Sequence, residues 1–123
     1  MINIAILGFG VVGGGITEVI EQNKKALKAY VGDDIYVKKI LDLRTFPDSP
    51  FADRIINDFS VVEKDEEISI VIEVIGGAKI AYDFTKRALL AGKSVVTSNK
   101  ELVATHGAEL LELAREKYNE KRE

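Results

Sequence analysis

The chain contains 123 residues, 46% of them hydrophobic and 30% charged, with a formal net charge of −3 and a pI of about 5.3. This length suits one compact globular domain, and the acidic balance argues against nucleic acid as a partner. The sequence has no cysteine, which excludes disulfides, and its single histidine predicts no metal site. It has no long apolar run, so we expect a cytoplasmic protein without a membrane partner.

The N-terminal segment predicts a strand, a glycine turn and a helix in direct succession. Residues 2–7 form an apolar, β-branched run of strand length, and because this run follows the first methionine directly we expect no signal or transit peptide. Gly8, Gly10 and Gly13 come next in the spacing G-x-G-x-x-G, before an apolar pattern of helical period that we expect to span residues 11–30. A strand before the motif and a helix after it favour a nucleotide site over a glycine turn without a ligand.

Each of the three glycines has a physical role in such a turn. Gly8 lets the chain turn tightly out of the strand, Gly10 lets a pyrophosphate approach the backbone, and Gly13 lets the helix pack close to the strand. The first helical turn then offers unpaired N–H groups and the positive end of the helix dipole to the phosphates. The predicted phosphate-binding residues are therefore Gly8, Phe9, Gly10, Val11, Val12 and Gly13.

The rest of the chain alternates predicted strands with predicted helices. Residues 45–53 hold both prolines and are expected to form a loop, residues 58–63 suit either a short helix or a strand, and residues 115–123 are expected to fray. We expect strands at residues 35–41, 54–57, 69–75 and 94–97, a helix at residues 78–91, and a last helix that is clearest at residues 108–118. This alternation predicts a Rossmann-type, doubly wound α/β fold with a mainly parallel sheet in the order 3-2-1-4-5, flanked by helices.

Three predicted turns converge at the carboxyl ends of the strands, where sheets of this kind bind their ligands. They comprise residues 8–13, the pair Gly76 and Gly77, and residues 98–100. The glycine pair either lies against the nicotinamide end of a cofactor or simply ends a strand before a helix. Glu73, in the apolar run before this pair, either faces the crevice or serves as a structural hydrogen-bond acceptor, and we favour the second role.

Asp42 and Arg44 stand where the second strand ends, next to the expected position of the adenosine ribose. An acid there accepts hydrogen bonds from the ribose hydroxyls and repels a 2′-phosphate, which favours NAD. Arg44 could instead bind the 2′-phosphate of NADP. The alternative is an aspartate at the entry to a loop, followed by a solvated arginine.

Lys100 is the residue of greatest chemical interest, because it follows a buried strand beside the predicted crevice. Most lysines are solvated surface charges, but a lysine in this place can exchange a proton with a substrate. Asn99 is positioned to orient a substrate or the nicotinamide amide, and Ser98 lies in the same turn without a partner that would make it a nucleophile.

Four segments give the chain a family resemblance. Gly-Phe-Gly-Val-Val-Gly at residues 8–13, Val-Ile-Glu-Val-Ile-Gly-Gly at 71–77, Ala-Gly-Lys-Ser-Val-Val-Thr-Ser-Asn-Lys-Glu-Leu-Val-Ala at 91–104 and His-Gly-Ala-Glu-Leu at 106–110 together resemble homoserine dehydrogenase. The resemblance implies an oxidoreductase that interconverts L-homoserine and aspartate 4-semialdehyde with NAD or NADP. It also implies that Lys100 is the catalytic lysine, assisting proton transfer at the substrate hydroxyl while hydride moves to the nicotinamide.

The chain departs from this family in two places. Where the family commonly has Val-Arg-Asp, residues 42–44 are Asp-Leu-Arg, which leaves the choice between NAD and NADP open, with NAD favoured. The substrate-binding and dimerisation region of the family lies after the part present here. We therefore expect residues 1–123 to form only the dinucleotide-binding domain of a longer protein. This domain should bind a cofactor but not turn over homoserine. The full-length protein is expected to be a homo-oligomer, either a dimer or a tetramer.

Two other functions compete with this interpretation. Sugar or polyol dehydrogenases of the glucose-fructose oxidoreductase type also place a catalytic lysine after Ala-Gly-Lys and a strand, but typically within Glu-Lys-Pro, whereas Lys100 lies within Asn-Lys-Glu. A cofactor-sensing module without chemistry is the second competitor. The missing substrate region supports such a module, and the Asn-Lys pair argues against it.

Overall fold

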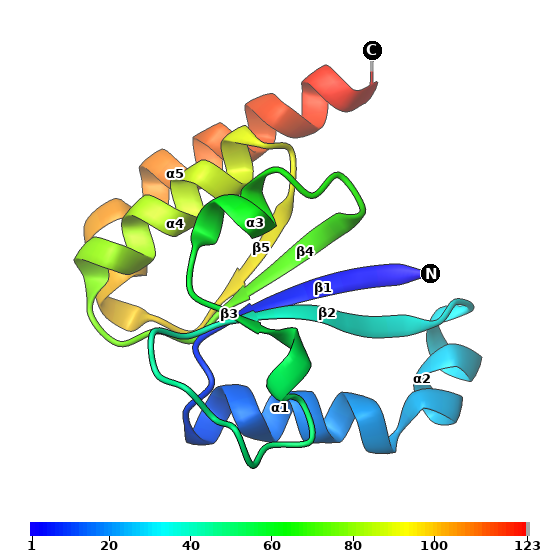
Figure 1. Ribbon diagram of the computed structural model, residues 1–123. Coiled ribbons are helices and arrows are strands. Elements are labelled where there is room, and N and C mark those ends of the chain that lie inside the picture. The colour runs from blue at the N-terminus through cyan, green and yellow to red at the C-terminus, as the bar shows by residue number, and fades with distance from the viewer. Residues whose placement is uncertain (123) are drawn as a thin grey trace.

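The computed structural model describes residues 1–122, and it is a five-stranded parallel sheet with helices on both faces (Figure 1). The strands lie in the order β3-β2-β1-β4-β5, so the predicted Rossmann-type fold and strand order are confirmed. The elements in chain order are β1 (Ile2–Leu7), α1 (Val11–Gln22), α2 (Lys24–Val31), β2 (Ile35–Leu41), the 3-10 helix η1 (Ala52–Arg54), β3 (Ile55–Ile56), α3 (Phe59–Glu63), β4 (Ile68–Glu73), α4 (Ala78–Leu90), β5 (Ser94–Thr97) and α5 (Lys100–Arg122).

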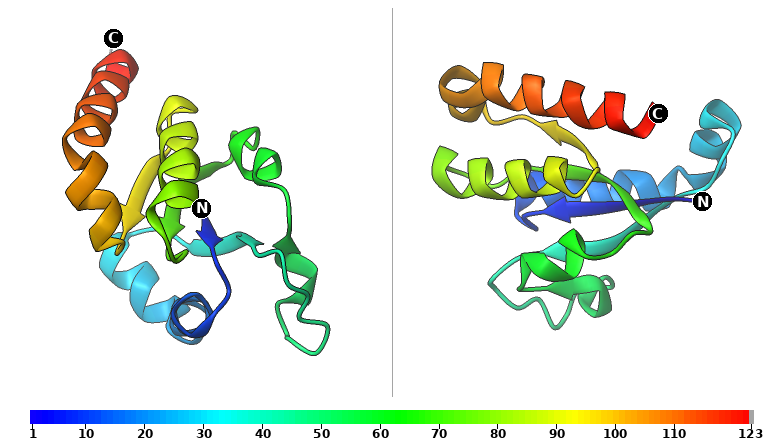
Figure 2. Two further views of the ribbon diagram at one scale, coloured as in Figure 1. Left: turned by 90° about the vertical axis from the view of Figure 1, so that its left-hand side faces the viewer. Right: turned by 90° about the horizontal axis from the view of Figure 1, so that it is seen from above.

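Alternating side chains of β1 divide the core between the two faces of the sheet. Ile4 and Ile6 pack with side chains of α1, while Ala5 and Leu7 pack with α3 and α4. Figure 1 shows the corresponding layers, with α1 and α2 below the sheet and α3, α4 and α5 above it. Figure 2 shows α4 and α5 running side by side, joined by a third apolar cluster that includes Leu102. The period of two along β1 therefore sets which helices cover which face.

The predicted first helix is in fact two helices, because it is interrupted at Asn23. The side-chain amide of Asn23 donates a hydrogen bond to the carbonyl of Val19 (2.7 Å), which the Asn23 backbone N–H also contacts (3.1 Å). Asparagine disfavours helix interiors because its amide competes with the backbone in this way. The helix expected at residues 11–30 thus ends as α1 and restarts as α2.

The last helix is longer than its apolar pattern indicated. It begins at Lys100 and continues to Arg122, so residues 115–122 of the segment expected to fray are helical, and residue 123 lies outside the described residues. Pairs of opposite charge three residues apart support its last turns, among them Arg115 with Glu112 (3.2 Å). Lys121 also donates a hydrogen bond to the carbonyl of Gly92, which ties this end to the turn before β5.

The segment after β3, for which the sequence allowed either a short helix or a strand, is the helix α3. Asp58 caps it by accepting a hydrogen bond from the Ser60 N–H (2.9 Å). The preceding loop contains η1, which the sequence analysis did not predict, and β3 is only two residues long. Because β3 is so short, most of β2 lies at the edge of the sheet.

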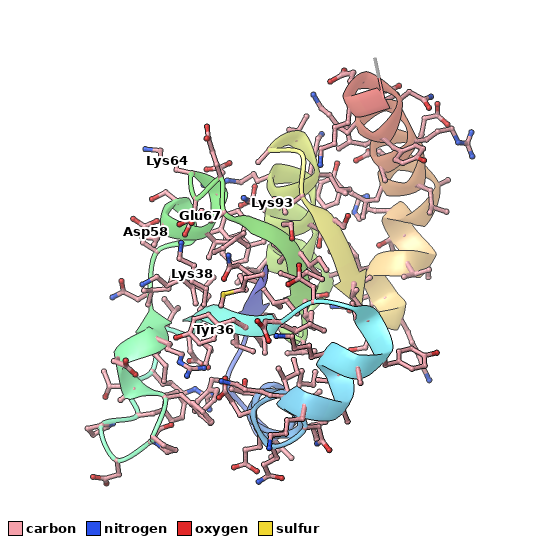
Figure 3. All side chains as sticks on the ribbon, turned by 90° about the vertical axis from the view of Figure 1, so that its right-hand side faces the viewer. Tyr36, Lys38, Asp58, Lys64, Glu67 and Lys93 are labelled. Atoms are coloured by element: carbon pink, nitrogen blue, oxygen red, sulfur yellow. The ribbon has the colours of Figure 1, made fainter. Side chains whose placement is uncertain are left out.

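Lys38, in the middle of β2, has carboxylate partners in the segment that precedes β4. Lys38 forms ion pairs with Asp65 (2.7 Å) and Glu67 (2.9 Å), and Figure 3 shows Lys38 and Glu67 pointing toward each other. Nearby Lys93 is buried and donates hydrogen bonds to the carbonyls of Asp65 (2.6 Å) and Ile68 (2.8 Å). These charges stabilise the amino ends of the strands, opposite the predicted crevice. Among the described residues, no helix has the length and apolarity needed to cross a membrane.

Candidate dinucleotide-binding site

A cleft of about 400 Å³ opens at the carboxyl ends of β1, β2 and β4. Figure 2 (left) looks toward this edge of the sheet. The cleft is lined by Gly8 and Gly10 of the glycine turn, by Asp42 and Arg44 after β2, and by Gly76 after β4. The order of the strands reverses at β1, so the cleft lies at the point where parallel sheets of this type bind ligands.

The glycine turn has the geometry that its spacing predicted. Gly8 has a φ of +104°, a conformation that favours glycine. A Cβ atom on Gly13 would lie 1.8 Å from the carbonyl oxygen of Gly8, so only glycine permits the close packing of α1 against this turn. A Cβ atom on Gly10 would instead have open space around it, with the Arg44 Nη2 atom the nearest neighbour at 3.8 Å. Gly10 therefore leaves room above the backbone rather than relieving a contact.

The amino end of α1 is open to a ligand. Gly10 is the N-cap residue and offers no side chain to cap the helix, and the first turn carries no acidic residue. Val11 is 96% exposed and Val12 58% exposed, so neither side chain covers the amides of this turn. Together with the room above Gly10, these free N–H groups form a cradle that fits a pyrophosphate.

The carboxylate of Asp42 already has several hydrogen-bond donors from the chain itself. It accepts a hydrogen bond from the Phe9 backbone N–H (2.9 Å), from the Arg44 backbone N–H (2.9 Å), and from the Arg44 side chain through Nε (3.1 Å) and Nη2 (2.9 Å). The hydrogen bonds from the Arg44 side chain, with those of the two backbone N–H groups, lower the pKa of Asp42 to about 2. Asp42 thus links the glycine turn to the loop after β2.

Arg44 lies at the mouth of the cleft with 65% of its side chain exposed. Its guanidinium group lies beside Gly10 and over the ring of Phe46, 5.2 Å from the ring centroid. Among the described residues, Arg44 donates hydrogen bonds from its side chain only through Nε and Nη2, to Asp42, so both hydrogens on Nη1 can reach a ligand. The structure therefore presents a cation at the end of β2 in front of the predicted aspartate.

Glu73 serves as a structural hydrogen-bond acceptor, the role that we favoured from the sequence. It is fully buried, and its two carboxylate oxygens accept hydrogen bonds from the Ile75 N–H (2.7 Å) and the Thr97 hydroxyl (2.5 Å). The first of these bonds explains why β4 ends at Glu73, two residues earlier than predicted, because the chain turns there to reach the carboxylate. The second joins the ends of β4 and β5 behind the site.

Asn99 joins the turn after β5 to the turn after β4. Its side-chain amide donates hydrogen bonds to the carbonyls of Ile75 (3.3 Å) and Gly77 (2.8 Å), and its side-chain oxygen accepts one from the Leu102 N–H (2.9 Å). Asn99 therefore caps α5 while it holds that helix beside the glycine pair. The next residue, Lys100, is exposed at the first position of α5.

The three turns come together less completely than the sequence indicated. The first two share the cleft through Gly8, Gly10 and Gly76, but residues 98–100 line a separate, shallow pocket of about 340 Å³. Gly77 is the N-cap residue of α4 and does not line the cleft, although it is bonded to Asn99. The predicted catalytic lysine and Ser98 thus lie beside the cleft rather than in it.

Several residues that shape the site were not predicted. Asn57, after β3, lines the cleft and also a neighbouring pocket of about 450 Å³ that begins at the loop after β2. Ile80 lines the apolar wall of the cleft, and Phe46 supports Arg44. Asn57 and Phe46 lie in loops, which carry no periodic pattern, so no signal in the sequence showed that these two positions shape the site.

The fold, the glycine turn and the open helix terminus define a dinucleotide-binding domain of the Rossmann class. The protein-family model that describes the NAD-binding domain of homoserine dehydrogenase matches residues 8–121 of this chain. The chain therefore belongs to the homoserine dehydrogenase family.

Relatives with known sequence or structure agree with this assignment. The chain is 40% identical over 119 residues to the homoserine dehydrogenase of Lactococcus lactis, covering 92% of this chain and 28% of the relative, and 38% identical over 117 residues to that of Pseudomonas aeruginosa, covering 94% and 27%. The homoserine dehydrogenase structure from Thiobacillus denitrificans superposes with a TM-score of 0.87 at 34% identity, covering 94% of this chain and 27% of that one. A hyperthermophilic archaeal homoserine dehydrogenase in complex with NADPH gives a TM-score of 0.76 at 26% identity, covering 95% and 41%. These matches do not favour a sugar dehydrogenase or a sensing module.

Proposed function

We propose that this chain is the cofactor-binding domain of an enzyme that interconverts L-homoserine and aspartate 4-semialdehyde by hydride transfer to NAD or NADP. Membership of the family supports the reaction class. The structural observation that supports the proposal is the set of hydrogen bonds made by Asn99, a bridge that holds the start of α5 against the turn after β4. That bridge fixes Lys100 beside the cofactor cleft.

In this proposal the bound cofactor supplies the hydride acceptor, and the chain supplies position and proton transfer. Residues 8–13 bind the pyrophosphate through the open end of α1. Gly76 and Gly77 lie along the nicotinamide side, with Ser98 and Asn99 at the far rim. Lys100 assists proton transfer at the substrate hydroxyl.

The rest of the enzyme lies outside this chain, because the chain spans less than a third of the curated relatives described above. We propose that the remaining part binds homoserine and forms a homodimer or homotetramer, in the cytoplasm. The isolated chain then binds cofactor without oxidising homoserine. Homoserine-dependent formation of reduced cofactor by the purified chain contradicts this division of the protein.

We further propose that the pair Asp42 and Arg44 lets the domain accept both cofactors. The sequence favoured NAD because of Asp42, but Arg44 neutralises this carboxylate and keeps N–H groups free for a phosphate. For NAD, Asp42 accepts the ribose hydroxyls. For NADP, Arg44 binds the 2′-phosphate.

Calorimetric titration of both cofactors tests this proposal on the Arg44→Ala variant. Loss of a charge-assisted phosphate contact weakens NADP binding by a factor of about 10 or more, whereas NAD binding stays within about twofold. Arg115→Ala is the matched control, because Arg115 is likewise an exposed arginine that forms an ion pair with a carboxylate close to it in the chain, that of Glu112 on α5, and it does not line the cleft. An equal effect of Arg44→Ala on the two cofactors contradicts the role of Arg44.

A further inference from the structure

Aromatic rings connect the glycine turn to the loop after β2. The ring of Phe9 contacts Phe46 edge to face, with 5.0 Å between centroids, and contacts Phe51 in the same manner at 6.4 Å. The Phe9 backbone N–H bonds to Asp42 at the start of this loop. Thus Phe9 uses both its backbone and its side chain to hold the loop against the turn that forms the phosphate cradle.

Phe46 has a second contact that Phe51 lacks. The Arg44 guanidinium lies over the Phe46 ring, while its edge donates to Asp42. An exposed arginine ordinarily samples many rotamers, and here a carboxylate and a ring limit it from two sides. The guanidinium is held at the border between the cleft and the neighbouring pocket, both of which Arg44 lines.

We propose that Phe46 is a positioning residue for recognition of the 2′-phosphate of NADP, acting through Arg44. The inference rests on the proposed cofactor function of this site. An arginine that is ordered before the ligand arrives loses less rotamer entropy on binding, so the ring raises affinity for the phosphorylated cofactor alone. NAD, which has no 2′-phosphate, gains nothing from the same contact.

Phe51 provides a matched control within the same loop. Its ring packs on Phe9 as Phe46 does, but its cation partner is Arg54, at 5.2 Å. Arg54 forms an ion pair with Glu21 of α1 (2.7 Å) and does not line the cleft. Shortening Phe51 therefore loosens the loop without touching the guanidinium of Arg44.

The experiment is a calorimetric titration of NADP and of NAD into the 123-residue chain and its variants at one ionic strength. Phe46→Leu and Phe46→Met, which both remove the ring, are expected to weaken NADP binding about three- to fivefold, the factor that a partly exposed cation–π contact provides. NAD binding should change less than about twofold under the same principle, since that contact touches only Arg44. Phe51→Leu should leave the ratio of the NADP and NAD affinities at its wild-type value. Phe46→Tyr, which keeps a ring, should also have the wild-type ratio.

Two results overturn the role of Phe46. One is an equal loss of affinity for both cofactors in Phe46→Leu and Phe46→Met, which shows that the ring only stabilises the loop. The other is the same change of ratio in Phe51→Leu. Either result leaves the proposed function intact, whereas a wild-type chain that binds neither cofactor refutes the proposed function and this inference together.

Discussion

At the scale of single residues, the glycine spacing predicted more than any other feature of the sequence. Gly8 and Gly13 have the conformation and the close contact that the motif requires. The hydrogen bonds of Asp42 could not be read in the same way, because they depend on a loop that folds back on Phe9. A motif specifies backbone geometry within a few residues, but partners from distant segments are set by packing that one sequence does not show.

Two neighbouring glycines of α1 should respond in opposite directions to alanine. Gly13→Ala places a Cβ atom 1.8 Å from the Gly8 carbonyl oxygen, whereas a Cβ atom on Gly15 meets nothing within 4 Å. We expect Gly13→Ala to lower the free energy of unfolding by about 2 kcal/mol or more through this overlap, and Gly15→Ala to raise it by up to about 1 kcal/mol through helix propensity. Urea unfolding followed by circular dichroism measures both. Equal free energies in the two variants contradict the geometry of the turn.

Asp42 should make stability depend on pH below about pH 5. Because the folded protein holds the pKa of Asp42 at about 2, below its ordinary value of 3.8, its contribution is complete above about pH 5 and is lost as the pH falls through 2. Since Arg44 is exposed, solvent screening reduces the contribution to about 1 kcal/mol. The unfolding free energy of the wild type should exceed that of Asp42→Asn by this amount at pH 6, and the difference should shrink progressively as the pH falls from about 5 through 2. A constant difference across that range refutes the effect.

At the scale of whole elements, apolar period and cap residues predicted where most strands and helices lie. The boundaries that were missed have identifiable side-chain causes. Asn23 interrupts a helical pattern, and the Glu73 carboxylate ends β4 by binding the Ile75 N–H. The start of α5 was missed because Gly107 interrupts the helical pattern after the first turns, although Asn99 caps the helix.

The bridge at Asn99 can be divided into its two parts by substitution. Asn99→Ala removes both the cap of α5 and the hydrogen bonds to Ile75 and Gly77. Asn99→Asp keeps the acceptor for the cap but loses the donors to those carbonyls. We expect unfolding free energies about 2 and about 1 kcal/mol below the wild type, respectively, measured by urea unfolding. An Asn99→Asp variant as unstable as Asn99→Ala shows that the cap contributes nothing.

At the scale of the whole molecule, the alternation of strands and helices was enough to predict the strand order and the edge of the sheet at which the cleft opens. It did not predict that Lys100 and Ser98 face a pocket of their own beside the cleft. That division depends on how the short β5 and the long α5 pack against α4, which involves contacts between segments far apart in the chain. The arrangement agrees with a domain that binds the cofactor in one place and presents its lysine to a substrate held by another part of the enzyme.

The central claim, that this chain binds a nicotinamide dinucleotide in the cleft, is tested most directly by nuclear magnetic resonance. Amide spectra of the ¹⁵N-labelled chain are recorded during titration with NAD and, separately, with NADP. The account predicts saturable shifts that fit one site and that concentrate on the amides of residues 8–13, 42–44 and 76–77. Amides in these three segments that stay unshifted at saturating concentrations of both cofactors contradict it.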